Sequence, residues 1–152
     1  MAAAPDTDRM TMCSYCGCRS NTLIARFSRE HEAIVNVSGS LRRAARSGDS
    51  AATRAAAELL GELVGPHTAS EERSLFDVLR TSPEFTQHVD SLCAEHADIE
   101  ELLAAARSGS VEHALRLDES LRRHIDKEEN GLFPAAVVEL DGASWEWAVA
   151  RA

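Results

Sequence analysis

Two segments of the chain each place a histidine and a glutamate four residues apart, His67-Thr-Ala-Ser-Glu71 and His124-Ile-Asp-Lys-Glu128. If each segment is helical, residues i and i+4 lie on one face, about one turn apart. Each segment then offers an imidazole nitrogen and a carboxylate oxygen to the same point in space. Such an arrangement is typical of a metal site built between helices, and it requires several helices around one core.

Apolar residues recur at three- and four-residue steps along four stretches of the chain. The pattern predicts helices over about 22–47, 49–79, 83–108 and 111–140, because that spacing places the apolar residues on one face. Asn21 or Ser20, Asp49, Ser82 and Ser110 are the predicted N-caps. Short connections favour antiparallel neighbours. We therefore expect an all-α fold, an antiparallel up-down four-helix bundle with a short C-terminal helical tail over about 144–152.

Two proline-containing sites are expected to disturb these helices. Gly65-Pro66 should interrupt the second helix just before His67, since proline lacks the backbone N–H. A kink that re-aims the histidine and a restart of the helix at proline are equally consistent with this sequence. Gly131 and Pro134 are expected to bend or break the fourth helix.

Histidines also occur in the other two apolar stripes, His31 in the first helix and His96 in the third. A single buried histidine is more often hydrogen-bonded than metal-bound. Four of them near the middles of four stripes, two with a glutamate on the same face, are poorly explained by coincidence. The sequence thus predicts a two-metal site in the bundle core, with the ligands His31, His67, Glu71, His96, His124 and Glu128.

Helical geometry sets other candidates apart from these ligands. Glu72 and Glu129 follow their histidines by five residues, about 140° around the helix, whereas a four-residue step leaves only about 40°. His88 and His113 are eight and eleven residues from the nearest ligand histidine on their own helix, about 12 and 16 Å of rise. We expect these two histidines to lie at the surface or at a helix end.

The order His31, His67-x-x-x-Glu71, His96, His124-x-x-x-Glu128 resembles the hemerythrin-like family, whose domain is also called the histidine–histidine–glutamate cation-binding domain. The resemblance covers roughly residues 22–140. It implies a non-haem centre of two iron ions bridged by an oxo or hydroxo group. By the family pattern, His31 and His67 hold one iron, His96 and His124 hold the other, and Glu71 and Glu128 bridge them.

The chain departs from the oxygen-carrying hemerythrins of invertebrates at two ligand positions. Those proteins have a second histidine one turn after the third-helix histidine, where this chain has Glu100. They also have an aspartate at a five-residue spacing on the fourth helix, where Glu128 stands at a four-residue spacing. Glu100 is a candidate seventh ligand, weighed evenly against a solvated helix carboxylate. A carboxylate in place of a neutral histidine should stabilise ferric iron and favour redox turnover over oxygen carriage.

Imidazole and carboxylate donors suit iron, and also zinc or manganese. Two octahedral ions offer about twelve positions, of which four imidazoles, two bridging carboxylates and one bridging oxygen fill roughly ten. The open positions favour a small diatomic or peroxide ligand: peroxide, dioxygen or nitric oxide. Catalase-like peroxide removal is the first enzymatic hypothesis. The alternatives are a non-enzymatic iron or redox sensor and a structural zinc-binding bundle.

Three cysteines cluster near the N-terminus as Cys13-x-x-Cys16-x-Cys18. They are one ligand short of a structural zinc or iron–sulfur site. A redox or second metal site, docking of a protein partner, and a flexible tail with exposed thiols all remain open. Some bacterial hemerythrin-like proteins look similar in beginning with such a cluster. We expect residues 1–19 to form a flexible segment and residues 20–152 to form the bundle, with Cys93 as a small core residue.

The formal net charge of −9 argues against nucleic acid or an anionic membrane as the main partner. No apolar run reaches the roughly 20 residues needed to span a bilayer. The stretch from Met1 to Met12 also lacks the apolar core of a signal peptide. We therefore expect a cytoplasmic protein whose cysteines are reduced or metal-bound.

Overall fold

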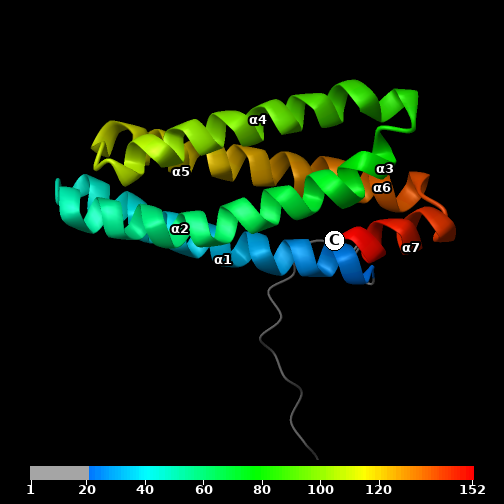
Figure 1. Cartoon of the computed structure of the whole chain (residues 1–152), viewed down its shortest axis with the longest axis horizontal. Coiled ribbons are helices and arrows are strands. Elements are labelled where there is room, and N and C mark those ends of the chain that lie inside the picture. The colour runs from blue at the N-terminus through cyan, green and yellow to red at the C-terminus, as the bar shows by residue number, and fades with distance from the viewer. Residues whose placement is uncertain (1–20) are drawn as a thin grey trace, which may run out of the picture.

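Four long helical arms lie side by side in the computed structural model, which describes residues 21–152 (Figure 1). The first and third arms are the single helices α1 (Thr22–Arg46) and α4 (Pro83–Arg107). The second arm comprises α2 (Ser50–Glu71), the π-helical segment η2 (Glu72–Phe76) and α3 (Asp77–Leu79). The fourth comprises α5 (Val111–Lys127), the π-helical segment η3 (Glu128–Leu132) and α6 (Phe133–Glu139). The helix α7 (Gly142–Arg151) follows at the end that holds α3 and α6.

Each arm packs against two neighbours: α1 against α2 and α5, and α4 against the same two helices. Successive arms run in opposite directions and are joined by short connections (Figure 1). The predicted all-α, up-down four-helix bundle with a helical tail is therefore confirmed. No helix within residues 21–152 is long and apolar enough to span a lipid bilayer.

The predicted caps account for most of the helix boundaries. The Asn21 carboxamide oxygen accepts hydrogen bonds from the backbone N–H groups of Leu23 and Ile24, and the Asp49 carboxylate accepts one from Ala52. These bonds satisfy donors that a helix leaves unpaired in its first turn. Ser82 occupies its predicted position but caps nothing with its side chain, because its hydroxyl donates to Glu139 instead.

The sequence predicted that Gly65-Pro66 interrupts the second helix before His67. This prediction was wrong, because α2 continues through Pro66 to Glu71. Both Gly65 and Pro66 are exposed, as is Glu62, whose carbonyl loses its partner when residue 66 has no N–H. On this face water can hydrate the freed carbonyl, so the helix need not break. In the fourth arm the predicted disturbance at Gly131 and Pro134 takes the form of η3 followed by α6.

The apolar core has two parts. One cluster gathers at the end of the bundle that holds η2, α6 and α7, and it includes Phe27, Phe76 and Phe133. The other fills the opposite half and includes Ile34, Leu60 and Leu117. His31 lies between Phe27 and Ile34 along α1, and His96 lies between Leu92 and Ile99 along α4. The histidine layer therefore separates the two clusters, in the middle of the bundle.

Candidate metal centre

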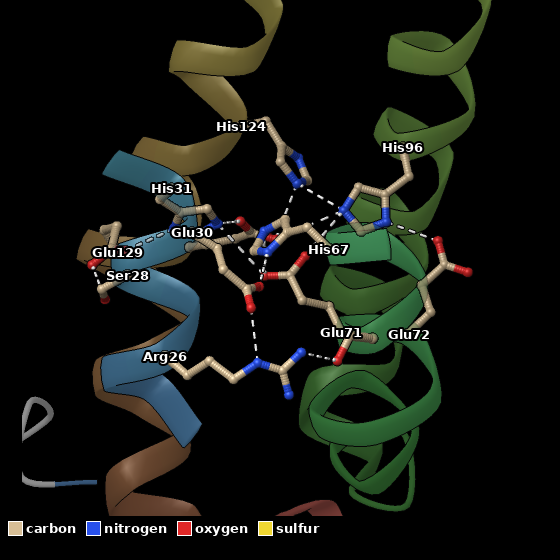
Figure 2. A network of polar contacts seen from close by, with 12 residues as sticks. Arg26, Ser28, Glu30, His31, His67, Glu71, Glu72, His96, His124 and Glu129 are labelled. Atoms are coloured by element: carbon tan, nitrogen blue, oxygen red, sulfur yellow. Dashed lines mark hydrogen bonds and ion pairs between the residues drawn. The ribbon is translucent and has the colours of Figure 1, made fainter. Parts of the chain in front are cut away.

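The six predicted ligand side chains meet in the middle of the bundle. Figure 2 shows His31, His67, Glu71, His96 and His124 pointing toward one another. The first and third arms contribute one histidine each, and the second and fourth contribute a histidine with the glutamate one turn later. None of the six is more than 6% exposed. They form two clusters that share both glutamates: His31, His67, Glu71 and Glu128 in one, and Glu71, His96, His124 and Glu128 in the other.

The two oxygens of each shared glutamate face different histidine pairs. Glu71 Oε1 lies 3.2 Å from His67 Nε2, while its Oε2 lies 3.5 Å from His96 Nε2. Glu128 Oε2 lies 3.1 Å from His31 Nε2, while its Oε1 lies 3.0 Å from His124 Nε2. Donors that bind one octahedral ion at ~2.1 Å lie about 3.0 Å apart when adjacent. The spacing therefore suits two ions with both carboxylates between them.

Several of these donor atoms lack the partner that burial demands. His31 Nε2 and all four carboxylate oxygens of Glu71 and Glu128 are buried and form no hydrogen bond within residues 21–152. His96 Nε2 and His124 Nε2 face each other at 2.9 Å, so in the neutral rings two lone pairs would repel. Buried carboxylates without compensation are strongly unfavourable. Cations placed between these atoms would satisfy all of them, and the donor set therefore fits a metal pair.

Each of the four clustered histidines directs its other ring nitrogen, Nδ1, at a glutamate of a neighbouring arm. His31 Nδ1 lies 2.7 Å from Glu129, and His67 Nδ1 lies 2.7 Å from Glu30. His96 Nδ1 lies 2.8 Å from Glu72, and His124 Nδ1 lies 2.9 Å from Glu95. A carboxylate can only accept, so each Nδ1 carries the hydrogen and each Nε2 is left to bind a metal. We call Glu30, Glu72, Glu95 and Glu129 the outer glutamates.

The outer glutamates follow a cyclic order around the bundle. The outer glutamate of each of the first three arms accepts a hydrogen bond from the histidine of the next arm, and the outer glutamate of the fourth arm accepts one from the histidine of the first. Figure 2 shows part of this cycle. Arg26 Nε donates a 2.8 Å hydrogen bond to Glu30, and Lys127 Nζ donates one to Glu95. The arrangement has an approximate twofold pattern in which arms one and two correspond to arms three and four.

Two phenylalanines support the same pattern. Phe76 stacks on the His96 ring with centroids 5.5 Å apart, and Phe133 stacks on the His31 ring with centroids 5.6 Å apart. Glu72 and Phe76 are the first and last residues of η2, and Glu129 and Phe133 correspond to them in the fourth arm. Each histidine of α1 and α4 is therefore held by a carboxylate at its edge and an aromatic ring on its face.

The family model for the hemerythrin HHE cation-binding domain matches residues 22–136. The chain belongs to this family. No curated protein and no solved structure gives a significant match. The matched region contains both histidine–glutamate clusters and all four outer glutamates, and it ends before α7. The hemerythrin family binds cations, and the two buried clusters supply donor sets for them.

The outer glutamates of this hemerythrin domain are the site residues that sequence reasoning missed. Helical geometry set Glu72 and Glu129 apart from the ligands, and neither belongs to the two ligand clusters. They nevertheless touch the centre, because each contacts a histidine of another arm. A signal was present in four dipeptides that join a clustered residue to an outer glutamate: Glu30-His31, Glu71-Glu72, Glu95-His96 and Glu128-Glu129.

Without metal, the charges of the hemerythrin centre favour protonation of His31 and His67. Burial lowers the pKa of the His31 imidazole, but the surrounding carboxylates outweigh burial and raise this pKa to about 11. Burial also opposes protonation of His67, yet the charge of Glu71 and the bond to Glu30 raise its pKa to about 9. Burial raises the pKa of the Glu71 carboxyl, but the histidines around it hold this pKa well below its usual value. A cation that binds His31 and His67 would therefore compete with protons for these imidazoles.

The structure separates Glu100 from the clustered residues. Glu100 is exposed on α4, and neither cluster found among the described residues includes it. His88 is exposed, and His113 bonds Ser110 at the start of α5, as expected for surface and helix-end histidines. Cys93 is half-buried against the apolar cluster around Phe76, and its sulfur lies 3.1 Å from an Arg80 nitrogen. Cys13, Cys16 and Cys18 lie outside the described residues.

Weakening one outer glutamate should weaken metal binding without emptying the site. Glu129→Gln keeps an acceptor near His31 but removes the charge that polarises the imidazole. We expect a ~10- to 100-fold loss of metal affinity, measured by competition with a chelator of known affinity. Glu119→Gln, an exposed position on α5, is the matched control and should bind as the parent does. Equal affinity in the two variants would show that Glu129 does not act on the metal.

Proposed function

We propose that this hemerythrin-family chain is a non-haem di-iron protein that reacts with or senses peroxide, dioxygen or nitric oxide. The observation that carries the proposal is the set of unpaired carboxylate oxygens of Glu71 and Glu128, one from each residue facing each histidine pair. Four imidazoles and two shared carboxylates are a donor set that suits iron. A bound iron pair would supply redox chemistry and open positions for a small ligand.

The chain's own residues would orient the centre and restrict access to it. The outer glutamates fix the histidine rings, and the burial of all six side chains shields the centre from bulk solvent. Phe27 and Phe133 add apolar surface next to His67 and His31, which disfavours bulk water. We propose catalase-like peroxide removal as the first activity to test, in a cytoplasmic setting.

Metal analysis of freshly purified protein, combined with its near-ultraviolet absorption, tests the proposal. We expect two iron ions per chain and the charge-transfer bands of a bridged diferric pair. Stoichiometric zinc with no colour would overturn the proposal in favour of a structural bundle.

Oxygen release from added peroxide then distinguishes an enzyme from a sensor. We expect the parent to release oxygen and His124→Ala to lose this activity, because the variant lacks one of the four imidazoles. His88→Ala, at an exposed position on the preceding arm, is the control and should keep the activity. An iron-loaded parent without turnover would favour the non-enzymatic sensor, for which metal-dependent binding of a partner to residues 13–18 is the corresponding assay.

A further inference from the structure

The helix α7 lies outside the region that matches the hemerythrin family, and it packs against the part of the bundle that supports His96. The helix α7 contacts η2 most extensively and α3 to a lesser extent. Ala148 of α7 is fully buried in the same apolar cluster as Leu75 and Phe76 of η2. Trp145 and Trp147 are partly buried against that cluster. The C-terminal helix therefore covers η2 from the outside.

A polar contact reinforces this apolar packing. Arg73 Nε, in η2, donates a 2.8 Å hydrogen bond to the backbone carbonyl of Arg151, at the last residue of α7. The Arg151 guanidinium in turn lies 3.8 Å from the centroid of the Trp147 ring. Arg73 is the direct neighbour of Glu72, so the end of α7 is attached one residue away from an outer glutamate.

Both ends of η2 act on His96. Glu72, its first residue, accepts the bond from His96 Nδ1 at 2.8 Å, and Phe76, its last residue, stacks on the imidazole with an interplanar angle of 10°. A π-helical turn is held by its surroundings rather than by intrinsic preference, and such turns are common at functional sites. The packing that keeps η2 in this form therefore also fixes the His96 ring.

We propose that α7 is a positioning element for the metal site formed with His96 and His124, acting through η2, Glu72 and Phe76. The inference rests on the proposed function, since it concerns one of the two metal positions. The two metal positions are then unequal. Loosening α7 should weaken binding of the ion at His96 and His124, and it should leave binding of the ion at His31 and His67 unchanged. The C-terminal helix thereby sets the affinity of one half of the centre.

A pair of neighbouring substitutions in the full chain tests this role. Ala148→Glu places a charge in the buried contact with η2, whereas Val149→Glu adds the same charge at a half-exposed position of the same helix. With Co²⁺ as a redox-inactive probe in calorimetric titrations, we expect Ala148→Glu to weaken one of two sites at least ~10-fold. Hydrogen exchange over residues 72–76 should accelerate in this variant. Val149→Glu should match the parent in both measurements.

Two further backgrounds identify the affected site. In His31→Ala only the site at His96 and His124 stays complete, and adding Ala148→Glu should weaken its remaining Co²⁺ binding. In His96→Ala the other site stays complete, and adding Ala148→Glu should change nothing. A merely structural role of α7 would weaken both backgrounds alike, and that result would overturn the inference.

If Ala148→Glu does not fold, Arg73→Ala tests the same role of α7 at the site formed with His96 and His124. Arg73 is exposed, so its removal leaves the core intact while breaking the bond to α7. We expect about a three- to tenfold weakening at the same site, and near-parental binding in Arg73→Lys, which keeps a donor. If the parent binds two Co²⁺ ions and the variants bind both ions with the affinities of the parent, the proposed role of α7 is overturned. A parent that binds none would instead overturn the proposed function.

Discussion

Replacing Glu71 with alanine is expected to abolish binding of both metal ions. The two oxygens of this carboxylate face different histidine pairs, 3.2 Å from His67 and 3.5 Å from His96, so one substitution removes a donor from each cluster. It also removes one of the two anions that, among residues 21–152, belong to both histidine clusters. Since loss of a group that merely orients a ligand costs ~10- to 100-fold in affinity, loss of a shared ligand should cost more at both positions.

Metal content per chain after dialysis against a weak chelator measures this effect. Glu62→Ala, at an exposed position of the same helix, is the control and should retain two ions. His31→Ala should lose the ion on its own side first, because it belongs to one cluster alone. If Glu71→Ala folds and keeps both ions at parental affinity, Glu71 is not shared between them.

The elements that sequence predicted well are those fixed by burial along a single helix. The stripe through Phe27, His31 and Ile34 marks the buried face of α1, and the same regularity located the other arms and the six clustered side chains. Local capping was equally predictable, since Asn21 and Asp49 bond only to N–H groups two or three residues ahead. Both kinds of feature depend on short-range geometry that periodicity describes.

The features that sequence missed depend on contacts between arms. Helical geometry places Glu72 away from His67 on its own arm, but it says nothing about His96 of α4, which Glu72 contacts. The same holds for Asp118 of α5, which is buried and accepts hydrogen bonds from Ser38 and Arg42 of α1. The π-helical turns and the continuation of α2 through Pro66 likewise depend on the surroundings: packing against the apolar cluster, and exposure to water.

The metal-free protein is expected to become less stable as the pH rises from about 6.5 to 9 and beyond. His31 and His67 have ordinary pKa values of 6.5 when unfolded, but pKa values of about 11 and about 9 in the folded chain. Between these limits the folded state binds more protons than the unfolded state, so the free energy of unfolding falls with pH. The shift at His67 alone corresponds to a loss on the order of 3 kcal/mol.

At acidic pH the free energy of unfolding of the metal-free protein depends on pH in the opposite direction and rises as the pH rises. The pKa values of Glu71 and Glu128 lie below their usual 4.5 in the folded chain, although burial opposes this, because the neighbouring histidines favour the charged carboxylates. Their contribution to stability is complete above 4.5 and is lost as the pH falls through the lowered values. The metal-free protein should therefore be most stable between about pH 4.5 and 6.5.

Bound metal should move this optimum to higher pH, because metal and proton compete for the same Nε2 atoms. Urea unfolding at pH 6, 8 and 10, with and without metal, measures both profiles. His67→Gln should remove part of the alkaline loss in the metal-free protein, whereas His88→Gln, at an exposed position, should not. Other groups titrate above pH 9, so the difference between these two variants isolates the buried imidazole. If metal-free stability rises between pH 6.5 and 9, the histidines enter the folded core uncharged, and metal uptake would release no protons from them.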